Sequence, residues 1–456
     1  MRRLFCSLAL LGCFLAQGQV STRLSTAMEA FNADAQLSHA LVSLYVINAK
    51  TGAVVFDQNS SMGMATASTE KIITAATAFD ILGKDFKYET RFGIVNTPRG
   101  KSLYIDPSGD PTLASWRWDD TKAPVFLSKL KAAIQQTGVK ELHSVIIYTG
   151  LWGDETIPDG WIWEDLGNYY GAGAQALNWR ENQFDLILRS GAEGSPVSIV
   201  KTDPYLYDYA ITSKATAGSK TSDDNTNLYY PSMGNKKGIL TGTIPAEKKG
   251  FVISGSIYDP ANQFVKTVIS NLKGTVSFAS DKITVTAKEE KNVNWFFTNA
   301  SPDLSKIIYW FLRKSVNLYG EALLKTVGLK QKGQATTDNG IDAEKEYWKD
   351  KGVDPEELHL YDGSGLSPQN RITTKAQVTI LKYAQQQPWF ADYYEAFPVY
   401  NDMKMKSGTI NRVKGFSGYQ QSKDGDQYIF SMLVNNYSGS QYALIRKMYK
   451  VLDELK

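Results

Sequence analysis

Helical periodicity at both ends of the chain, with strand-like runs between them, is the sequence feature that most limits the possible folds. Residues 22–37 place apolar side chains such as Leu24 and Met28 at helical spacing, and residues 441–455 do the same with Leu444. Both patterns predict amphipathic helices. Helices at the two termini with strands beside them favour one α/β domain that the termini close. The middle of the chain is then predicted to be an insertion.

Strand and turn signals outline that insertion, from about residue 87 to residue 256. Before it, a hairpin is predicted over 39–58 and a helix from Ser68 to Gly83. Within it, the predicted elements are strands at 89–95, 103–105, 144–148, 184–188 and 251–257 and a helix at 126–136. After it, the predicted elements are helices at 261–272 and 304–327 and a hairpin with strands 416–421 and 428–435. We therefore predict a discontinuous domain, 19–86 and 257–456, that carries a β-rich insertion at 87–256.

The first 18 residues resemble a secretory signal peptide. A basic start, an apolar run and a small-residue exit follow one another, and the run is too short to span a bilayer. A buried N-terminal helix is the alternative. The sequence before Cys13 also resembles a lipoprotein cleavage box, so a lipid anchor at Cys13 is a second possibility. Both cysteines, Cys6 and Cys13, lie in this leader, so we expect an exported, periplasmic protein without disulfides.

Charge and histidine content exclude several classes of function. Lys and Arg number 50 and Asp and Glu 47, a balance without the basic excess of a nucleic-acid-binding protein. The sequence has only three histidines, His39, His143 and His359, and two cysteines, so a three-histidine zinc site or a cysteine-rich metal cluster is implausible. We expect chemistry based on hydroxyls, carboxylates and lysines, with no metal or organic cofactor.

The first reactive motif is Ser68-Thr69-Glu70-Lys71, at the start of a predicted helix. Ser68 and Lys71 would share one helical face. A neutral Lys71, its pKa lowered by burial and neighbouring cations, would accept the proton of the Ser68 hydroxyl. A helix cap followed by a solvated lysine is the simpler interpretation of this motif alone.

Two later motifs add polar groups at a helix break and on a strand. Ser315 and Asn317 lie between two helical segments, where a helix cap is the simpler reading. Lys406-Ser407-Gly408-Thr409 suits an edge strand along which an extended peptide binds, although a polar edge with a protective lysine would look similar. A Ser407 or Thr409 hydroxyl can bind a carboxylate, and Gly408 permits close approach.

Together, the three motifs resemble the signature of penicillin-binding proteins and β-lactamases. Because the whole β-rich segment lies between the first and second motifs, the chain is similar to the class C low-molecular-mass penicillin-binding proteins. These form the S13 peptidase family of D-alanyl-D-alanine carboxypeptidases and endopeptidases. Further matches are Gly109-Asp110-Pro111-Thr112-Leu113, Gly160-Trp161-x-Trp163-x-Asp165, Ser301-Pro302-x-Leu304 and Asp362-Gly363-Ser364-Gly365-Leu366-Ser367.

The resemblance implies an α+β catalytic domain, with an antiparallel sheet flanked by helices, and a serine mechanism. Ser68 would attack a D-Ala peptide carbonyl with Lys71 as base, through an acyl-enzyme that β-lactams mimic. Ser315, together with Lys71, would relay a proton to the leaving amine, and Asn317 would position the acyl chain. Lys406, Ser407 and Thr409 would hold the substrate carboxylate, and the backbone N–H groups of Ser68 and Thr409 would form the oxyanion hole.

The resemblance also assigns contacts to the insertion. Asp165 and Tyr170 would bind the amino end of a diamino acid in a peptidoglycan stem peptide; a turn residue and a core aromatic are the alternatives. The chain departs from the family at Val316, where Asp is frequent, at Ser407, where Thr is usual, and at Pro368, where a basic residue is common. The competing functions are a β-lactamase and a non-catalytic module that binds the wall or senses antibiotics.

Overall fold

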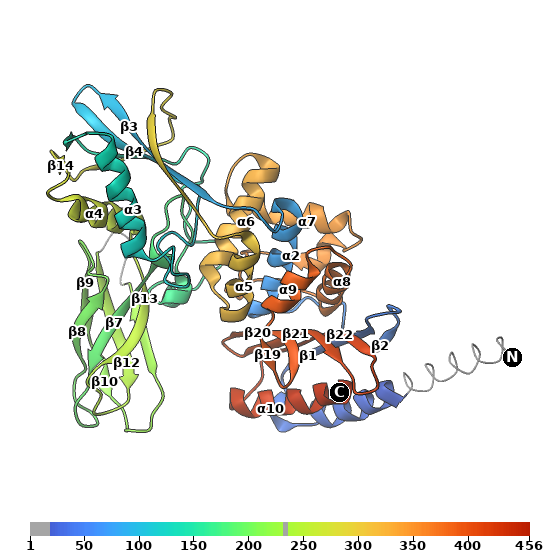
Figure 1. The fold of residues 1–456 in the computed structure, drawn as a ribbon. Coiled ribbons are helices and arrows are strands. Elements are labelled where there is room, and N and C mark those ends of the chain that lie inside the picture. The colour runs from blue at the N-terminus through green and yellow to red at the C-terminus, as the bar shows by residue number, and fades with distance from the viewer. Residues whose placement is uncertain (1–18, 231–235) are drawn as a thin grey trace. The chain divides into compact units, whose positions relative to one another are not determined.

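The computed structural model describes residues 19–230 and 236–456. The predicted signal peptide at 1–18, including Cys13, lies outside these residues. The chain folds into two compact units (Figure 1): the first comprises residues up to Lys84, 308–316 and 341–456, and the second comprises 85–307 and 317–340. The second unit thus extends beyond the expected 87–256. Strand pairing explains this, because residues 283–286 and 294–300 complete the sheet that begins at Glu89.

The first unit is built on a six-stranded antiparallel sheet in the order β19-β20-β21-β22-β1-β2. The predicted N-terminal and C-terminal hairpins are β1–β2 and β21–β22, and Leu41 of β1 lies opposite Asn435 of β22. The first unit's strands are β1 (Leu41–Asn48), β2 (Val54–Gln58), β17 (Leu358–His359), β18 (Arg371–Ile372), β19 (Val399–Tyr400), β20 (Met403–Ile410), β21 (Val413–Gln421) and β22 (Gln427–Asn435).

Helices cover both faces of this sheet (Figure 1). The terminal helices share one apolar core with the sheet, in which Leu24 and Met28 join Leu444 and Met448. The first helix ends at residue 32, earlier than predicted, because the Asp34 side chain accepts a hydrogen bond from Gln36 N and caps a separate 3-10 turn. The remaining helices are α2 (Lys71–Leu82), α5 (Leu304–Lys314), α7 (Thr337–Lys349), α8 (Thr374–Ala384), α9 (Phe390–Ala396), α10 (Gln441–Leu452), η1 (Ala35–Leu37), η2 (Ala67–Glu70), η6 (Pro355–Glu357) and η7 (Asp453–Leu455), of which α5 and α7 begin in the second unit.

The second unit contains the expected β-rich structure. A five-stranded sheet, β15-β6-β4-β3-β16, packs against α3 and α4 through an aromatic core that includes Phe92, Phe126 and Phe264. Its elements are β3 (Glu89–Thr97), β4 (Gly100–Asp106), α3 (Ala123–Gln136), β5 (Glu141–Leu142), β6 (Val145–Tyr148), η3 (Trp163–Asp165), η4 (Tyr169–Gly171), η5 (Arg180–Asn182), β7 (Gln183–Arg189), β8 (Ser198–Asp203), β9 (Ala210–Ser213), β10 (Thr216–Ala217), β11 (Asn225–Tyr229), β12 (Lys237–Ile244), β13 (Phe251–Ser256), α4 (Pro260–Leu272), β14 (Ser277–Phe278), β15 (Ile283–Thr286), β16 (Asn294–Ala300) and α6 (Asn317–Lys332).

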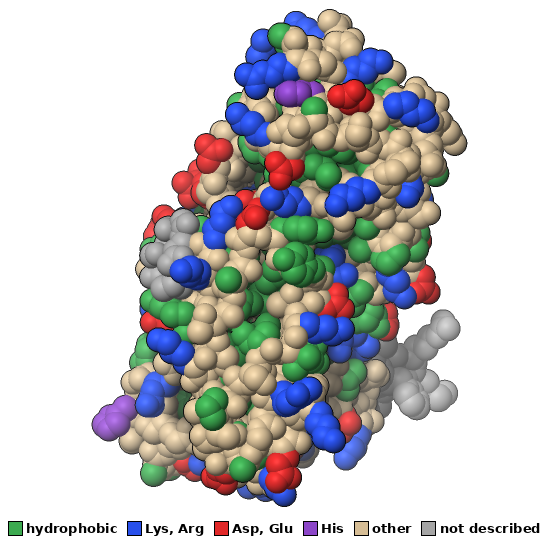
Figure 2. Space-filling model, turned by 90° about the vertical axis from the view of Figure 1, so that its left-hand side faces the viewer, with side chains coloured by type: hydrophobic (Ala, Val, Ile, Leu, Met, Phe, Trp, Pro, Cys, Tyr) green, Lys and Arg blue, Asp and Glu red, His purple; other side chains and the backbone are tan. Residues whose placement is uncertain are grey.

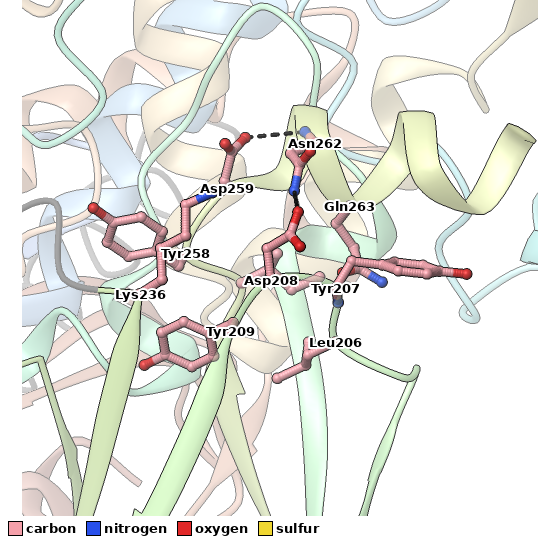
Figure 3. Close-up of a pocket in the computed structure, with 10 residues that line it drawn as sticks. Leu206, Tyr207, Asp208, Tyr209, Lys236, Tyr258, Asp259, Asn262 and Gln263 are labelled. Carbon is pink, nitrogen blue, oxygen red and sulfur yellow. Dashed lines mark hydrogen bonds between the residues drawn. The ribbon is translucent and has the colours of Figure 1, made fainter. Parts of the chain in front are cut away.

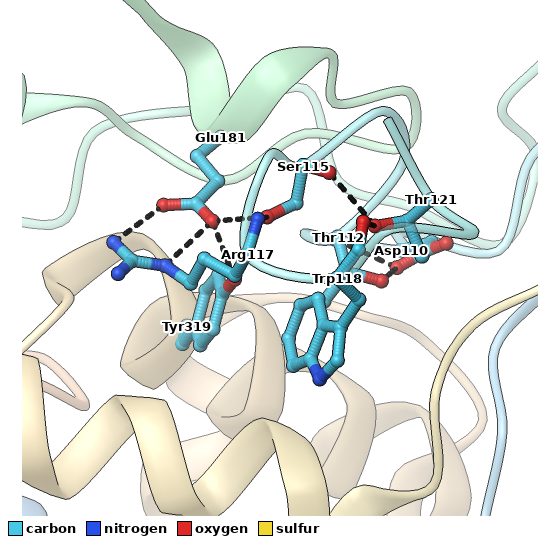
Figure 4. Close-up of polar contacts among 8 residues, drawn as sticks. All are labelled: Asp110, Thr112, Ser115, Arg117, Trp118, Thr121, Glu181 and Tyr319. Atoms are coloured by element: carbon cyan, nitrogen blue, oxygen red, sulfur yellow. Dashed lines mark hydrogen bonds and ion pairs between the residues drawn. The ribbon is translucent and has the colours of Figure 1, made fainter. Parts of the chain in front are cut away.

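A buried polar network, which we call the Glu181 network, stabilises the second unit (Figure 4). The Glu181 carboxylate accepts hydrogen bonds from Arg117 Nε at 2.8 Å, Tyr319 Oη at 2.7 Å and Ser115 Oγ at 2.5 Å. Burial acts to lower the pKa of Arg117, but its interactions with Glu181 and Tyr319 outweigh burial and raise it. The buried Glu181 carboxylate therefore has a charged partner, Arg117, and further hydrogen bonds.

The second unit also contains a small polar pocket. This pocket has a volume of about 10 Å³ and is lined by Tyr209 and Asn262 among others. In Figure 3, Asn262 donates hydrogen bonds to Asp208 and Asp259. This volume suits about one water molecule. On the face shown in Figure 2, Lys and Arg side chains are scattered among apolar and acidic ones. Across 19–230 and 236–456, none of the helices has both the length and the apolar character that crossing a bilayer requires.

Candidate active site

Ser68 lies in the 3-10 turn η2, directly before α2. The preceding Ala67 adopts a left-handed φ of 46°, an uncommon conformation for a residue with a side chain. Thr69 fixes the turn: its Oγ1 donates to Thr66 O at 2.8 Å and accepts from Gln377 Nε2 at 2.9 Å. Ser68 is half-buried while its neighbours are buried, so the fold presents this hydroxyl at the surface of a rigid turn.

Lys71, the first residue of α2, is in contact with Ser68. Its Nζ lies 3.0 Å from Ser68 Oγ, and its side chain is fully buried. The same Nζ donates a hydrogen bond to Ser364 O at 2.5 Å and lies 5.8 Å from the centre of the Phe311 ring. The one-turn spacing of the first motif thus places an amine against the hydroxyl, as the sequence predicted.

The Ser364 carbonyl that binds Lys71 belongs to a turn organised by Asp362. The buried Asp362 carboxylate accepts hydrogen bonds from the backbone N–H groups of Ser364, Gly365 and Ser367. Gly365 has φ 77°, and a Cβ there would lie 2.0 Å from Ala67 O, so only glycine allows this turn to pack on η2. The turn therefore holds a fixed acceptor beside Lys71.

Ser315 and Lys406 form a second hydroxyl–amine pair. Ser315 follows the end of α5 with a left-handed φ of 58°, which confirms the predicted helix break. Lys406, on β20, donates to Ser315 Oγ at 3.0 Å and to Ser407 O at 2.7 Å. Burial, together with the charges of Lys71 and Lys414, lowers the pKa of Lys406 well below its usual range. The Ser315 hydroxyl contacts Lys406 in the structure, whereas the predicted proton relay joins Ser315 to Lys71.

Gly408 brings β20 against the turn that carries Ser68. A Cβ at Gly408 would lie 2.4 Å from Thr66 O and 2.9 Å from Ser68 N, so a larger residue would force the strand away. Ser407 is half-buried and Thr409 is exposed on this strand. β19 pairs with only the first residues of β20, Met403 and Lys404. The third motif therefore presents hydroxyls on an edge strand next to the turn at Ser68.

Three predicted site residues belong to the second unit: Asn317, Asp165 and Tyr170. Asn317 is the first residue of α6, and its Nδ2 donates to Tyr170 O at 2.8 Å. Burial raises the pKa of Asp165, an effect opposed by a hydrogen bond from Tyr170, and raises the pKa of Tyr170 to about 12. The structure thus brings these three residues together, with Asp165 and Tyr170 half-buried.

Two features escaped the sequence analysis. The Ser364 carbonyl beside Lys71 lies in a segment noted for its family resemblance only. Lys414, on β21, is 5% exposed and donates to Thr409 Oγ1 at 2.8 Å. A lysine inside the run Val413-Lys414-Gly415-Phe416 was the available signal, because a charged residue rarely occupies a buried strand without a role.

The residues of these motifs suit hydroxyl and amine chemistry. The structure, over the residues it describes, contains no group of three or more His, Cys, Asp or Glu side chains arranged to hold a metal ion. What it does contain is a hydroxyl in contact with a buried amine, beside an edge strand with further hydroxyls and amines. Such an arrangement can activate a serine and bind an extended, anionic chain.

Comparison with known proteins gives a consistent result. A model described as the D-Ala-D-Ala carboxypeptidase 3 (S13) family matches residues 24–402. A D-alanyl-D-alanine carboxypeptidase of Actinomadura sp. (strain R39) is 26% identical over 465 residues, covering 93% of this chain and 83% of the relative.

Solved structures extend the likeness to the fold. Penicillin binding protein 4 (dacB) from Haemophilus influenzae has a TM-score of 0.78 at 20% identity, covering 91% of this chain and 96% of that one. The same protein complexed with a novel β-lactam has a TM-score of 0.71 at 17% identity, covering 94% and 98%. These likenesses confirm the predicted fold class.

Proposed function

This chain belongs to the D-Ala-D-Ala carboxypeptidase 3 (S13) family, and we propose from that premise that Ser68 is its nucleophile and Lys71 its general base. The protein is a serine-type D-Ala-D-Ala peptidase; neither a β-lactamase nor a non-catalytic module is favoured by its relatives. The observation that carries the residue assignment is the 3.0 Å separation of Lys71 Nζ and Ser68 Oγ.

In the first step, Ser68 Oγ attacks the carbonyl carbon of a D-Ala peptide bond while Lys71 Nζ takes the hydroxyl proton. The Ser364 carbonyl accepts a hydrogen bond from the Lys71 amine and so holds it beside Ser68; in its neutral form the amine has a lone pair that can accept the hydroxyl proton. The backbone N–H groups of Ser68 and Thr409 stabilise the negatively charged oxygen of the tetrahedral intermediate by donating hydrogen bonds to it. Each donor of this kind contributes about 10²- to 10³-fold to the rate.

In the second step, the peptide C–N bond breaks and the leaving amine takes a proton. Ser315, held by Lys406, supplies that proton and regains one from Lys71, which returns to its neutral form. Asn317 positions the acyl chain, and Lys406, Ser407 and Thr409 hold the substrate carboxylate. Water then hydrolyses the Ser68 ester with Lys71 as the base, which regenerates the free hydroxyl.

The substrate proposal follows the same premise. We assign peptidoglycan stem peptides, with D-Ala-D-Ala termini or D-Ala cross-links, as substrates, and β-lactams as covalent inhibitors that acylate Ser68. The structure of Haemophilus influenzae penicillin binding protein 4 with a β-lactam supports the inhibitor proposal. Asp165 and Tyr170 would bind the amino end of the stem-peptide diamino acid. We also propose export to the periplasm, because the sequence of residues 1–18 resembles a secretory signal peptide.

Labelling with a fluorescent penicillin tests this assignment. We expect the wild-type chain to take a stable label and to release D-Ala from stem peptides, and Ser68→Ala to abolish both. Ser43→Ala, which removes a buried hydroxyl on β1, is the matched control and should keep both. Label retained on Ser68→Ala would disprove the nucleophile, and rapid loss of label from the wild-type chain would indicate a β-lactamase. Mass spectrometry of digested muropeptides then separates cleavage of termini from cleavage of cross-links.

A further inference from the structure

Lys414 occupies a position that the proposed mechanism does not use. β20 and β21 pair so that Lys414 lies directly opposite Thr409, and side chains of such a pair project from the same face of the sheet. Lys414 is 5% exposed, whereas Thr409 is exposed. The Lys414 ammonium donates to Thr409 Oγ1 at 2.8 Å and lies 4.7 Å from the centre of the Phe416 ring. The buried Lys414 cation is therefore hydrogen-bonded to the exposed Thr409 hydroxyl of the third motif.

The charge of Lys414 is not balanced within the fold. Over 19–230 and 236–456, no carboxylate forms an ion pair with Lys414 or Lys406, and their side-chain hydrogen bonds go to hydroxyls and a carbonyl. Burial lowers the pKa of Lys414 to about 8, and the charge of Lys414 in turn lowers the pKa of Lys406. Burying an ammonium without a counter-ion is costly. An anion bound at the surface beside Thr409 would relieve that cost.

The hydrogen-bond direction at Thr409 identifies the kind of anion. Because the Thr409 oxygen accepts a proton from Lys414, its own O–H is left to donate to another acceptor. A hydroxyl polarised by an ammonium suits a charged oxygen acceptor, and charge-assisted hydrogen bonds are the stronger ones. Thr409 also belongs to the edge strand proposed to bind the substrate. The acceptor that a D-Ala-D-Ala peptide offers there is its terminal carboxylate.

We propose that Lys414 is a specificity residue that selects substrates with a free carboxylate on the carbon next to the scissile nitrogen, acting through the Thr409 hydroxyl. The proposal rests on the assignment of this strand to substrate binding under the proposed function. It adds a cation to that strand's hydroxyls and predicts discrimination against peptides whose terminal carboxylate is amidated. Lys414 does not take part in proton transfer, so its effect falls on binding rather than on the Ser68–Lys71 pair.

Equilibrium binding to the full chain carrying Ser68→Ala tests the proposal without turnover. The probes are one acylated D-Ala-D-Ala peptide with a free terminal carboxylate and the same peptide ending in a carboxamide. We expect the carboxylate peptide to bind about 10- to 100-fold more tightly. Adding Lys414→Met should lower the affinity of the carboxylate peptide selectively and leave only the smaller preference that Lys406 and Ser407 supply, and Lys414→Arg should keep most of the preference. Lys414→Gln is the alternative neutral variant if Lys414→Met does not fold.

Lys404→Met is the matched control, because Lys404 is a cation on β20, the strand of Thr409, with its own partner, Glu395, at 3.4 Å. It should leave the preference intact. Equal weakening of both peptides by Lys414→Met, or an equal effect of Lys404→Met, would overturn the proposal. The test distinguishes this proposal from the proposed function. A wild-type chain that takes no penicillin overturns the proposed function. A preference that depends on Lys414 in the Ser68→Ala chain upholds the carboxylate site whether or not the wild-type chain takes penicillin.

Discussion

Two buried polar clusters, one in each unit, differ in how their charges are compensated. In the Glu181 network, the carboxylate has a guanidinium partner and two hydroxyl donors. In the first unit, the buried amines of Lys406 and Lys414 have hydroxyl and carbonyl partners and, among the described residues 19–230 and 236–456, no carboxylate partner. A buried charge with its counter-ion holds a fold together, whereas one without it weakens the fold and prepares it to bind an anion. The variants below test this difference.

Lys71→Met should produce the largest effect, on chemistry alone. Removing the base that contacts Ser68 should lower the rate of penicillin acylation by about 10³-fold, because the hydroxyl is weakly nucleophilic without it. Stopped-flow or gel measurement of acylation gives the rate, and thermal unfolding should show a folded chain. Acylation at the wild-type rate would remove Lys71 from the mechanism.

Arg117→Met should produce the next largest effect, on stability alone. It leaves Glu181 buried without its counter-ion, which costs about 3–5 kcal/mol. Calorimetry should show a destabilised second unit, and part of the loss should return in the double variant Arg117→Met/Glu181→Gln. The rate of penicillin acylation per folded molecule should remain within about twofold of the wild type. A stability unchanged by Arg117→Met would mean that the network does not support the fold.

Lys414→Met should stabilise the protein near pH 7, the opposite outcome to Arg117→Met. Folding lowers the pKa of Lys414 to about 8, so the unfolded chain binds more protons between pH 8 and about 10.5, the ordinary value. The free energy of unfolding of the wild-type chain therefore rises with pH across that window. Below the window it is reduced by the full cost of burying the charged Lys414. The gain from Lys414→Met should be roughly 1–3 kcal/mol at pH 7 and should shrink toward pH 10.

Denaturant titrations of the two chains at pH 7 and pH 10 measure this difference. Lys404→Met, which removes a cation that has a carboxylate partner, should not stabilise the protein. A Lys414→Met chain that is less stable than the wild type at pH 7 would mean that packing of the lysine stem outweighs the burial of its charge.

Asp165→Asn should have the smallest effect, confined to one class of substrate. If its carboxylate binds the amino group of a diamino acid, cleavage of such peptides should fall by roughly three- to tenfold, because a partly shielded ion pair is lost. Penicillin acylation should stay the same, since the drug has no such group. Equal losses with both substrates would assign Asp165 to the fold instead.

The elements of the fold that could be predicted from the sequence are those determined by residues close together in the chain. The hairpin over 39–58 and the helix after Ser68 follow from apolar spacing and turn residues, and the break at Ser315 follows from the change between two helical segments. The helix α7 (Thr337–Lys349) was missed because its sequence is largely polar. The boundary of the second unit was missed because β16 pairs with β3, a contact between distant residues.

The site shows the same division. The three motifs are visible as sequence, but the Ser364 carbonyl reaches Lys71 only through the packing of Gly365 on η2. Lys414 looks like any other lysine until the register of β20 and β21 places it opposite Thr409. The burial of a charge depends on strand pairing and on what covers the sheet, and neither can be predicted from the residues next to it in the sequence.

The pairing of β1 with β22 has a consequence for biosynthesis. The strand that opens the first unit has no neighbour on that side until the strand ending at Asn435 has been made, and β20 with Lys406 is also among the last segments to be synthesised. A ribosome-bound chain that displays Ser68 and Lys71 still lacks the edge strand beside them. Contacts this distant also fold slowly. Catalytic competence should therefore be acquired only after the C-terminal segment is released, so nascent chains stalled before residue 403 should take no penicillin.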